Sequence, residues 1–247
     1  MSTLKLALLV SGSASTAAAI VRACAEGELE LEPALVIASN SKCLDNLLAA
    51  GLSQKQIKIF SPKELKLKAT KQNTSRDDLL AELILKECQR KGIDIIGQYG
   101  WLLKTPAQVI EAYPETMINQ HPGPLDPGRP DFGGHGMYGL RVHAARLKFA
   151  QEMSKLGDDG HWWTEATAQQ VAVEFDEGAV LKTARVEILR DDTAESLAAR
   201  VLAAEHQLQI DTLKELISGQ TQAIKRSEAL IPEAAHALLT KIKSEIL

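Results

Sequence analysis

The sequence is poor in cysteine, which limits its possible redox chemistry and metal binding. Its 247 residues include three cysteines, Cys24, Cys43 and Cys88, with no Cys-x-x-Cys spacing among them. An odd number of cysteines without that spacing argues against a disulfide framework and against a zinc site. We therefore expect three reduced thiols that pack as small apolar side chains, and a cytoplasmic location.

The sequence also lacks long apolar runs and an excess of positive charge. No stretch approaches the roughly 20 apolar residues of a membrane-spanning helix. The apolar segment 1–10 is interrupted by Ser11-Gly12 and lacks the parts of a signal peptide. The net charge of −4 argues against a dedicated nucleic-acid-binding protein. We therefore expect small-molecule partners, with neither nucleic acid nor membrane among them.

The amino-terminal half alternates short apolar runs with amphipathic stretches. Ser75 is suited to cap a helix that Gly92 would end. Strands alternating with helices predict a parallel sheet that is covered by helices on both faces. The Lys-rich run 64–71 is interpreted as a solvated segment. The predicted strands are 4–10, 35–38, 57–60, 93–98 and 117–120, and the predicted helices are 16–26, 44–50 and 75–90.

After residue 120 the pattern changes. Segments 166–173 and 180–188 alternate polar and apolar residues, which is typical of half-buried antiparallel strands. The predicted fold class is therefore α/β, a doubly wound and mostly parallel sheet with antiparallel edge strands. We expect one main domain over residues 1–220 and a helical extension over 221–247. The other predicted elements are a Gly- and Pro-rich loop at 121–139 and helices at 141–155, 193–218 and 232–247.

Asn119 and His121 form the most informative pattern in the chain. In an extended segment, residues two apart direct their side chains to the same side. An amide there could hold a developing oxyanion while the imidazole moves a proton. Asp176 could fix the tautomer of His121 and stabilise its protonated form. The sequence leaves open whether Asp176 reaches His121, because an Asp-x-Gly segment is also a common simple turn.

The loop at 11–16 joins the first predicted strand to the first predicted helix. A helix amino terminus at such a turn favours a phosphate group, and three hydroxyl side chains add donors. The loop matches neither the Gly-x-Gly-x-x-Gly pattern nor a Walker loop, so we do not expect a dinucleotide. A plain serine-rich turn remains the alternative.

Two further groups of residues stand out beside these loops. His135 and His143 could be combined with His121 and Asp131 into a metal site, but the spacing fits no compact ligand pattern. We therefore expect no metal. The pair Trp162-Trp163 is interpreted as a packing cap or an interface patch.

With these motifs in this order, the chain resembles the folate-dependent formyltransferases, most closely the glycinamide ribonucleotide transformylase family. The resemblance covers roughly residues 4–218, which is most of the chain. The segments that carry it are LLVSGSAST at 8–16, GWLLKTP at 100–106, MINQHPGPL at 117–125, FGGHGMYGLRVH at 132–143, EFDEGAVL at 174–181 and ARVLAAEH at 199–206.

The resemblance implies a Rossmann-like formyltransferase fold. It also implies transfer of a formyl group from the co-substrate 10-formyltetrahydrofolate to the amine of glycinamide ribonucleotide, without a metal. Its partners would be this phosphoribosyl amine and the folate, and a homodimer is left open. The implied catalytic residues are Asn119, His121 and Asp176. The implied substrate-binding residues are Ser11, Gly12, Ser13, Ala14, Ser15 and Thr16 for the phosphate, Gly133, Gly134 and Gly136 for close backbone approach, and Glu205 for the ribose. Leu102, Leu103, Val173 and Glu174 would contact the folate.

The chain departs from the family pattern at three places. The phosphate loop of the family usually reads Gly-x-Gly-Ser-Asn, whereas Ala14 and Thr16 stand here at the second Gly and the Asn. Gln169 stands where the family often has a His, and the tail after residue 220 is an addition. The altered loop keeps two alternatives open. One is a formyltransferase for another amine, such as a nucleotide-linked amino sugar, and the other is a non-catalytic nucleotide-binding module.

Overall fold

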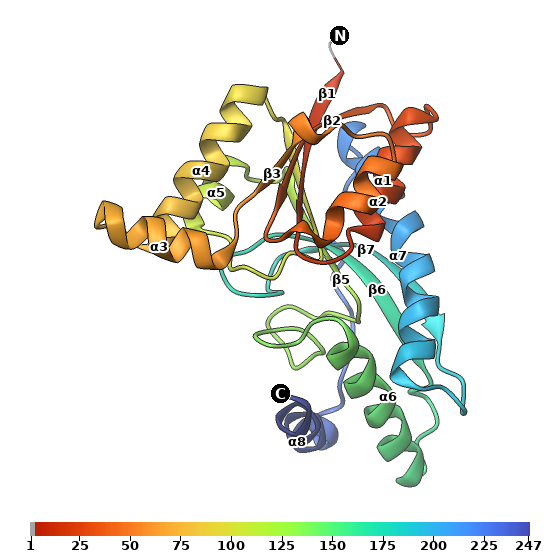
Figure 1. Ribbon diagram of the computed structural model, residues 1–247. Coiled ribbons are helices and arrows are strands. Elements are labelled where there is room, and N and C mark those ends of the chain that lie inside the picture. Colours follow the sequence, from red (N-terminus) through yellow and green to blue (C-terminus); the bar gives the residue numbers. More distant parts are fainter. Residues whose placement is uncertain (1–2) are drawn as a thin grey trace. The chain divides into compact units, whose positions relative to one another are not determined.

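The computed structural model describes residues 3–247, which form two compact units (Figure 1). Unit 1 contains the described residues up to Asn119 together with Leu213–Gln220. Unit 2 contains Gln120–Thr212 and Thr221–Leu247. Each unit is described by itself. No helix in the described part of the chain is both long and apolar enough to cross a membrane.

Unit 1 is a parallel sheet with helices on both faces. Its strands lie in the order β3-β2-β1-β4-β5, and each neighbouring pair is parallel. In Figure 1, α1 and α2 lie on one side of this sheet and α3, α4 and α5 on the other. The elements are β1 (Leu4–Val10), α1 (Ser15–Ala25), β2 (Leu31–Ala38), α2 (Leu44–Ala49), β3 (Ile57–Ile59), α3 (Pro62–Gln72), α4 (Arg76–Lys91), β4 (Ile95–Tyr99), α5 (Ala107–Ala112) and β5 (Met117–His121), with 3₁₀ turns at Ser41–Cys43 and Gln54–Gln56.

The elements of unit 1 follow from local sequence. All five residues of β4 are buried, as expected for a strand covered on both faces. Ser75 Oγ accepts a hydrogen bond from the Asp78 N–H at 3.0 Å, and Gly92 ends α4 in the left-handed conformation. Cys43 and Cys88 are buried and Cys24 is partly buried, all as free thiols, which confirms their expected packing role.

Unit 2 contains an antiparallel strand pair and three helices. The first strand, β6 (Trp163–Gln170), pairs with β7 (Val180–Glu187). The helices are α6 (Leu140–Lys155), the part of α7 (Ala194–Ile217) up to Thr212, and α8 (His236–Ile246), which follows a 3₁₀ turn at Glu233–Ala235. Over the described chain the strand order is β3-β2-β1-β4-β5-β6-β7. This order and the β6–β7 pair confirm the predicted fold class.

Two local predictions need correction, and a third is confirmed but incomplete. The Lys-rich run 64–71 is mostly exposed, as expected of a solvated segment, but it belongs to a helix, α3, in which only Leu65 and Ala69 are buried. One narrow apolar stripe at i and i+4 was too weak a signal for this surface helix. The strand predicted at 166–173 runs instead over 163–170, and the predicted final helix begins one turn later, as α8. Trp163, interpreted as a packing cap, packs against the core cluster of unit 2 that contains Phe132 and Phe149.

Candidate active site

In unit 1, the ends of three parallel strands bring the first group of candidate residues to one edge of the sheet. Val10 of β1 pairs with Tyr99 of β4, and Gln98 pairs with Asn119 of β5. The carboxyl edge of such a sheet is where doubly wound folds bind their ligands. The loop 11–16 and Asn119 therefore both lie at the edge that the fold rule assigns to a ligand.

The loop 11–16 is tied to the segment that carries Leu102 and Leu103. The Ser11 N–H donates to the Gly100 carbonyl at 3.2 Å, and the Leu102 N–H donates to Ser11 Oγ at 3.0 Å. Leu102 is 52% exposed and Leu103 is half-buried. Leu102 is therefore held in place through its backbone N–H, and its exposed side chain can make an apolar contact with the ring system of a ligand.

The loop 11–16 ends at the amino terminus of α1. Ala14 is the N-cap residue, with φ 59° in the left-handed region and no side-chain cap. The first N–H groups of a helix have no partner within the helix, so they and the helix dipole favour an anion here. Asn46 Nδ2 donates to the Ser13 carbonyl at 2.9 Å and holds the loop from α2. The loop can therefore bind a phosphate through its backbone.

In unit 2, the structure brings Asp176 to His121, which the sequence left open. His121 is 3% exposed, and its Nδ1 lies 3.5 Å from Asp176 Oδ2. Its Nε2 lies 3.2 Å from the Phe132 carbonyl oxygen. Both ring nitrogens thus face oxygen acceptors, and only the protonated imidazole can donate to both. The pair can hold and move a proton.

Asp176 is itself held in place from two directions. Gln169 Nε2 donates to Asp176 Oδ1 at 2.8 Å, and the Gly134 N–H donates to Asp176 Oδ2 at 2.9 Å. Asp176 has φ 61°, a left-handed conformation that is costly for a non-glycine residue and is often found at functional sites. Gln169 therefore acts as a donor at the place where the sequence differs from the family pattern.

Two glycines allow the backbone to approach this pair closely. A Cβ atom on Gly133 would lie 2.7 Å from Asp176 Cβ and 2.6 Å from Leu125 Cδ2. A Cβ atom on Gly178 would lie 1.7 Å from the Gln170 carbonyl oxygen. Both distances are too short for a side chain. The glycine-rich loop and the turn after Asp176 therefore need glycine at these positions.

Two titratable side chains that interact with His121 have shifted pKa values. Burial, with a smaller contribution from His121, lowers the pKa of His143 to about 4, so His143 is neutral at pH 7. Burial raises the pKa of Asp131, while N–H groups of Asp126 and Gly133 and the charges of His121 and Lys243 oppose that rise. Within residues 3–247, no three His, Cys, Asp or Glu side chains are grouped to hold a metal ion.

Glu205 forms a second polar group in unit 2, with Gln120. Glu205 is 3% exposed, and burial raises its pKa to about 7, although a hydrogen bond with the Gln120 side chain opposes the shift. Its Oε1 has no hydrogen-bond partner in the described part of the chain. Sequence reasoning missed Gln120. The signal was its position between Asn119 and His121, because adjacent residues of a strand face opposite sides.

The folate residues predicted in unit 2 lie on the segment just before Asp176. Val173 is 49% exposed, and Glu174 is also exposed. Phe175 is 38% exposed, and its ring centroid lies 5.8 Å from that of His135. This short segment therefore presents apolar surface and backbone groups beside the His121–Asp176 pair.

The structure is thus a doubly wound α/β fold in which the buried His121 at the end of β5 faces Asp176 in the connection between β6 and β7. Such a pair is typical of enzymes that use acid–base catalysis. Residues 4–213 match the model of the formyl transferase family. The chain belongs to this family, which confirms the family predicted from its motifs.

Proteins of similar sequence agree with this assignment to the formyl transferase family. The chain is 29% identical over 211 residues to a chloroplastic phosphoribosylglycinamide formyltransferase of Arabidopsis thaliana and 31% identical over 212 residues to one of Vigna unguiculata. These matches cover 85% and 86% of this chain but only 64% and 60% of the plant proteins. The chain thus spans less than two thirds of their length.

Solved structures give the same fold. The phosphoribosylglycinamide formyltransferase of Brucella melitensis is 26% identical, with a TM-score of 0.67, over 90% of this chain and all of that one. The glycinamide ribonucleotide transformylase 1 of Symbiobacterium toebii has a TM-score of 0.69 over 90% of this chain and 95% of that one. At 23% identity, the second likeness shows the fold alone.

Proposed function

We propose that this protein transfers a formyl group from 10-formyltetrahydrofolate to the amine of glycinamide ribonucleotide, a step of purine biosynthesis. The observation that carries the proposal is the pairing of the buried His121 with the partly buried Asp176, within the residues that match the family model. The activities named for the plant and Brucella melitensis proteins support the choice of this amine.

The reaction follows from the chemistry of three side chains. The substrate amine attacks the formyl carbon and gives a tetrahedral intermediate with an oxyanion. The Asn119 amide and protonated His121 donate to that oxyanion. Nε2 of His121 is the ring atom directed away from Asp176, so we assign it as the donor, which would share its N–H between the Phe132 carbonyl and the oxyanion. Asp176 stabilises the imidazolium and helps to move a proton from the attacking amine to N10 of the folate. Collapse of the intermediate then breaks the bond between the formyl carbon and N10, which releases tetrahydrofolate and leaves the formyl group on the amine.

We assign the remaining residues to binding. The loop of Ser11, Gly12, Ser13, Ala14, Ser15 and Thr16 takes the phosphate on backbone N–H groups and hydroxyls. Glu205, with an unpaired buried oxygen and its partner Gln120, accepts from ribose hydroxyls. Gly133, Gly134 and Gly136 allow close approach of backbone and substrate. Folate contacts Leu102, Leu103, Val173 and Glu174.

Two alternative functions, formylation of another amine and a non-catalytic nucleotide-binding module, both rest on the altered loop at 11–16. Ala14 puts a methyl group on a left-handed residue of the phosphate loop, where the family pattern has glycine. This change favours a different phosphorylated amine, such as a nucleotide-linked amino sugar, over loss of the reaction, because the His121–Asp176 pair is intact. The non-catalytic module is the third candidate.

One assay separates the three functions. Purified protein is incubated with 10-formyltetrahydrofolate and each of a panel of amines, with His121→Ala as the inactive control. We expect turnover of glycinamide ribonucleotide. Turnover of an amino sugar alone would replace the proposed substrate. Binding without any turnover would establish the non-catalytic module.

We also propose a cytoplasmic location. The structure shows free thiols at Cys24, Cys43 and Cys88, which suit a reducing compartment. A homodimer remains a prediction. Analytical ultracentrifugation of the purified protein would test it by measuring the mass of the particle in solution.

A further inference from the structure

Residues 221–247 lie beyond the segment that matches the family model, yet they contact the glycine-rich loop of the family motif. Their helix, α8, packs on the core of unit 2. Leu239 and Ile242 are buried in one cluster with Phe132 and Phe149. An apolar face thus docks α8 independently of its charged side chains.

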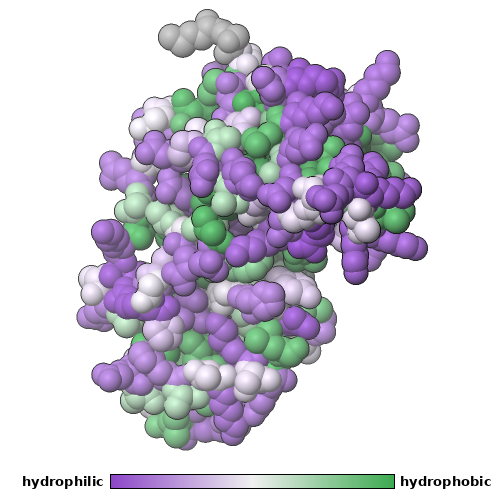
Figure 2. Space-filling model, turned by 90° about the vertical axis from the view of Figure 1, so that its left-hand side faces the viewer, coloured by the Kyte–Doolittle hydropathy of each residue, from purple (hydrophilic) through white to green (hydrophobic). Residues whose placement is uncertain are grey.

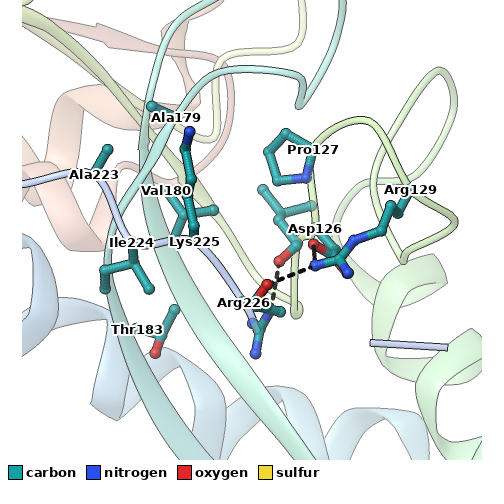
Figure 3. A pocket seen from close by; sticks show the side chains of 11 residues that line it. Asp126, Pro127, Arg129, Ala179, Val180, Thr183, Ala223, Ile224, Lys225 and Arg226 are labelled. Atoms are coloured by element: carbon teal, nitrogen blue, oxygen red, sulfur yellow. Dashed lines mark hydrogen bonds and ion pairs between the residues drawn. The ribbon is translucent and has the colours of Figure 1, made fainter. Parts of the chain in front are cut away.

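The first part of this segment is joined to residues 125–129 by polar contacts. Arg226 Nε donates to the Leu125 carbonyl at 3.0 Å, and its guanidinium pairs with Glu165. Arg129 bridges Asp126 and the Arg226 carbonyl, at 2.7 and 3.1 Å (Figure 3). Two of these contacts end on backbone carbonyls, those of Leu125 and Arg226. They therefore hold the backbone of residues 125–129 beside that of residue 226.

Apolar packing contributes less at this end of the segment. The Ile224 N–H donates to the Val180 carbonyl at 2.7 Å, which holds the segment beside β7. A cavity of about 290 Å³ remains between residues 125–129, 179–183 and 223–226 (Figure 3). Hydrogen bonds of Ile224 and Arg226 therefore hold this part of the segment beside the cavity.

The last turns of α8 reach the part of the loop nearest to His121. Lys243 Nζ donates to the Gly133 carbonyl at 2.6 Å and to the Asp131 carbonyl at 3.3 Å. These two carbonyls flank Phe132, whose own carbonyl lies 3.2 Å from His121 Nε2. The next N–H along the chain, that of Gly134, donates to Asp176 Oδ2. One ammonium group thus holds the peptide units on both sides of the contact with His121.

We propose that Lys243 is a positioning residue for the His121–Asp176 pair. It acts through the carbonyls of Asp131 and Gly133, so that the segment 221–247 completes the active site in this chain. A hydrogen bond from a charged donor is stronger than a neutral one, and its loss leaves two carbonyls without that donor. The expected effect of Lys243 on kcat rests on the proposed function. Its expected effect on the positions of Gly133, Gly134 and His121 does not.

The variant Lys243→Met tests the inference without removing the apolar face of α8. Lys241→Met is the matched control, because Lys241 lies on the same helix and its side chain is 74% exposed. Lys243→Arg is the rescue variant, because its guanidinium can still donate to carbonyls.

Two measurements are made by NMR on the ligand-free protein. For Lys243→Met we expect amide exchange of Gly133 and Gly134 to become about tenfold faster, and the ring signals of His121 to shift. Lys241→Met should leave both unchanged, and Lys243→Arg should restore both in large part. Unchanged Gly134 exchange and His121 signals in Lys243→Met, or equal effects in Lys241→Met, would overturn the inference.

The third measurement is kinetic. Displacement of catalytic groups by about 1 Å can cost as much as ~10²-fold in rate, so a loosened loop should lower kcat about tenfold while KM changes less than twofold. If wild type formylates glycinamide ribonucleotide and Lys243→Met keeps its full kcat, Lys243 does not position the pair. If wild type lacks this activity, the proposed function fails, and the NMR measurements alone decide the inference.

Discussion

The loop at 11–16 and the loop at 121–139 are built in different ways. The first ends at a helix amino terminus, and its cap residue Ala14 contributes no polar side chain, so backbone groups supply the attraction for an anion. The second surrounds a buried imidazole whose partners are Asp176 and a backbone carbonyl. A space-filling view (Figure 2) shows polar and apolar residues intermingled on the face that it presents.

The difference teaches how sensitive each loop should be to mutation. Where backbone groups bind the ligand, the loss of one side chain should cost little. Where buried side chains carry the chemistry, the loss of one side chain removes a function that no neighbour replaces. The following predictions test this contrast, from the largest expected effect to the smallest.

The largest effect is expected at the reactive strand. Asn119→Ala and His121→Ala should each lower kcat by about 10²–10³, the scale of losing one oxyanion donor. Formyl transfer at saturating substrate measures the effect, and circular dichroism checks that each variant is folded. A folded variant with near wild-type kcat would remove that residue from the mechanism.

The second effect concerns stability and pH, through Glu205. Its pKa of about 7 in the folded protein lies above the ordinary value of 4.5, so protonation favours the folded state. This contribution is present in full below pH 4.5 and is lost as the pH rises through 7. At about 1.4 kcal/mol per pKa unit, the difference between 4.5 and about 7 corresponds to a loss of roughly 3–4 kcal/mol.

Glu205→Gln removes that titration. The variant should match wild type near pH 5 and exceed it in free energy of unfolding at pH 9, measured by urea denaturation without ligand. Glu82→Gln, at an exposed position of α4, is the control and should follow wild type throughout. Parallel pH profiles for Glu205→Gln and wild type would show that Glu205 is not the titrating group.

The third effect concerns the phosphate loop. Ser15→Ala should raise KM for the phosphorylated amine about two- to fivefold, equivalent to roughly 0.3–1 kcal/mol for one contact near a helix terminus. KM for the folate should stay nearly constant. Ala14→Glu should raise KM of the amine further, because its carboxylate repels the phosphate. An unchanged KM in Ala14→Glu would show that the phosphate binds elsewhere.

The smallest effect separates backbone strain from side-chain chemistry in the same loop. A left-handed conformation costs an ordinary L-residue roughly 1–2 kcal/mol, and part of the gain from glycine is offset by its greater freedom in the unfolded chain. Ala14→Gly should therefore raise Tm by about 1–3 °C. Ala17→Gly, inside α1, should lower Tm. A lower Tm for Ala14→Gly would contradict the strain at φ 59°.

Local sequence patterns were sufficient for the fold class and for most element positions. Ser75 and Gly92 mark the ends of α4, because a capping side chain and a left-handed glycine act within one turn of the chain. The apolar run of β1 predicts its bounds of Leu4–Val10 for a similar reason. The helix α3 was missed because its two buried residues form too weak a pattern.

The candidate site was only partly readable from the sequence. Asn119, His121 and Asp176 stood out by type and spacing, but only the fold brings His121 Nδ1 to 3.5 Å from Asp176. The contact of Lys243 with Gly133 had no signal in the local pattern. Gln120 had a signal in its position between Asn119 and His121, but nothing local indicated that its partner is Glu205. A cap or an alternating strand depends on neighbours along the chain, so sequence encodes it directly. A hydrogen bond between distant residues depends on how helices and strands pack, and the packing is determined by the whole chain at once.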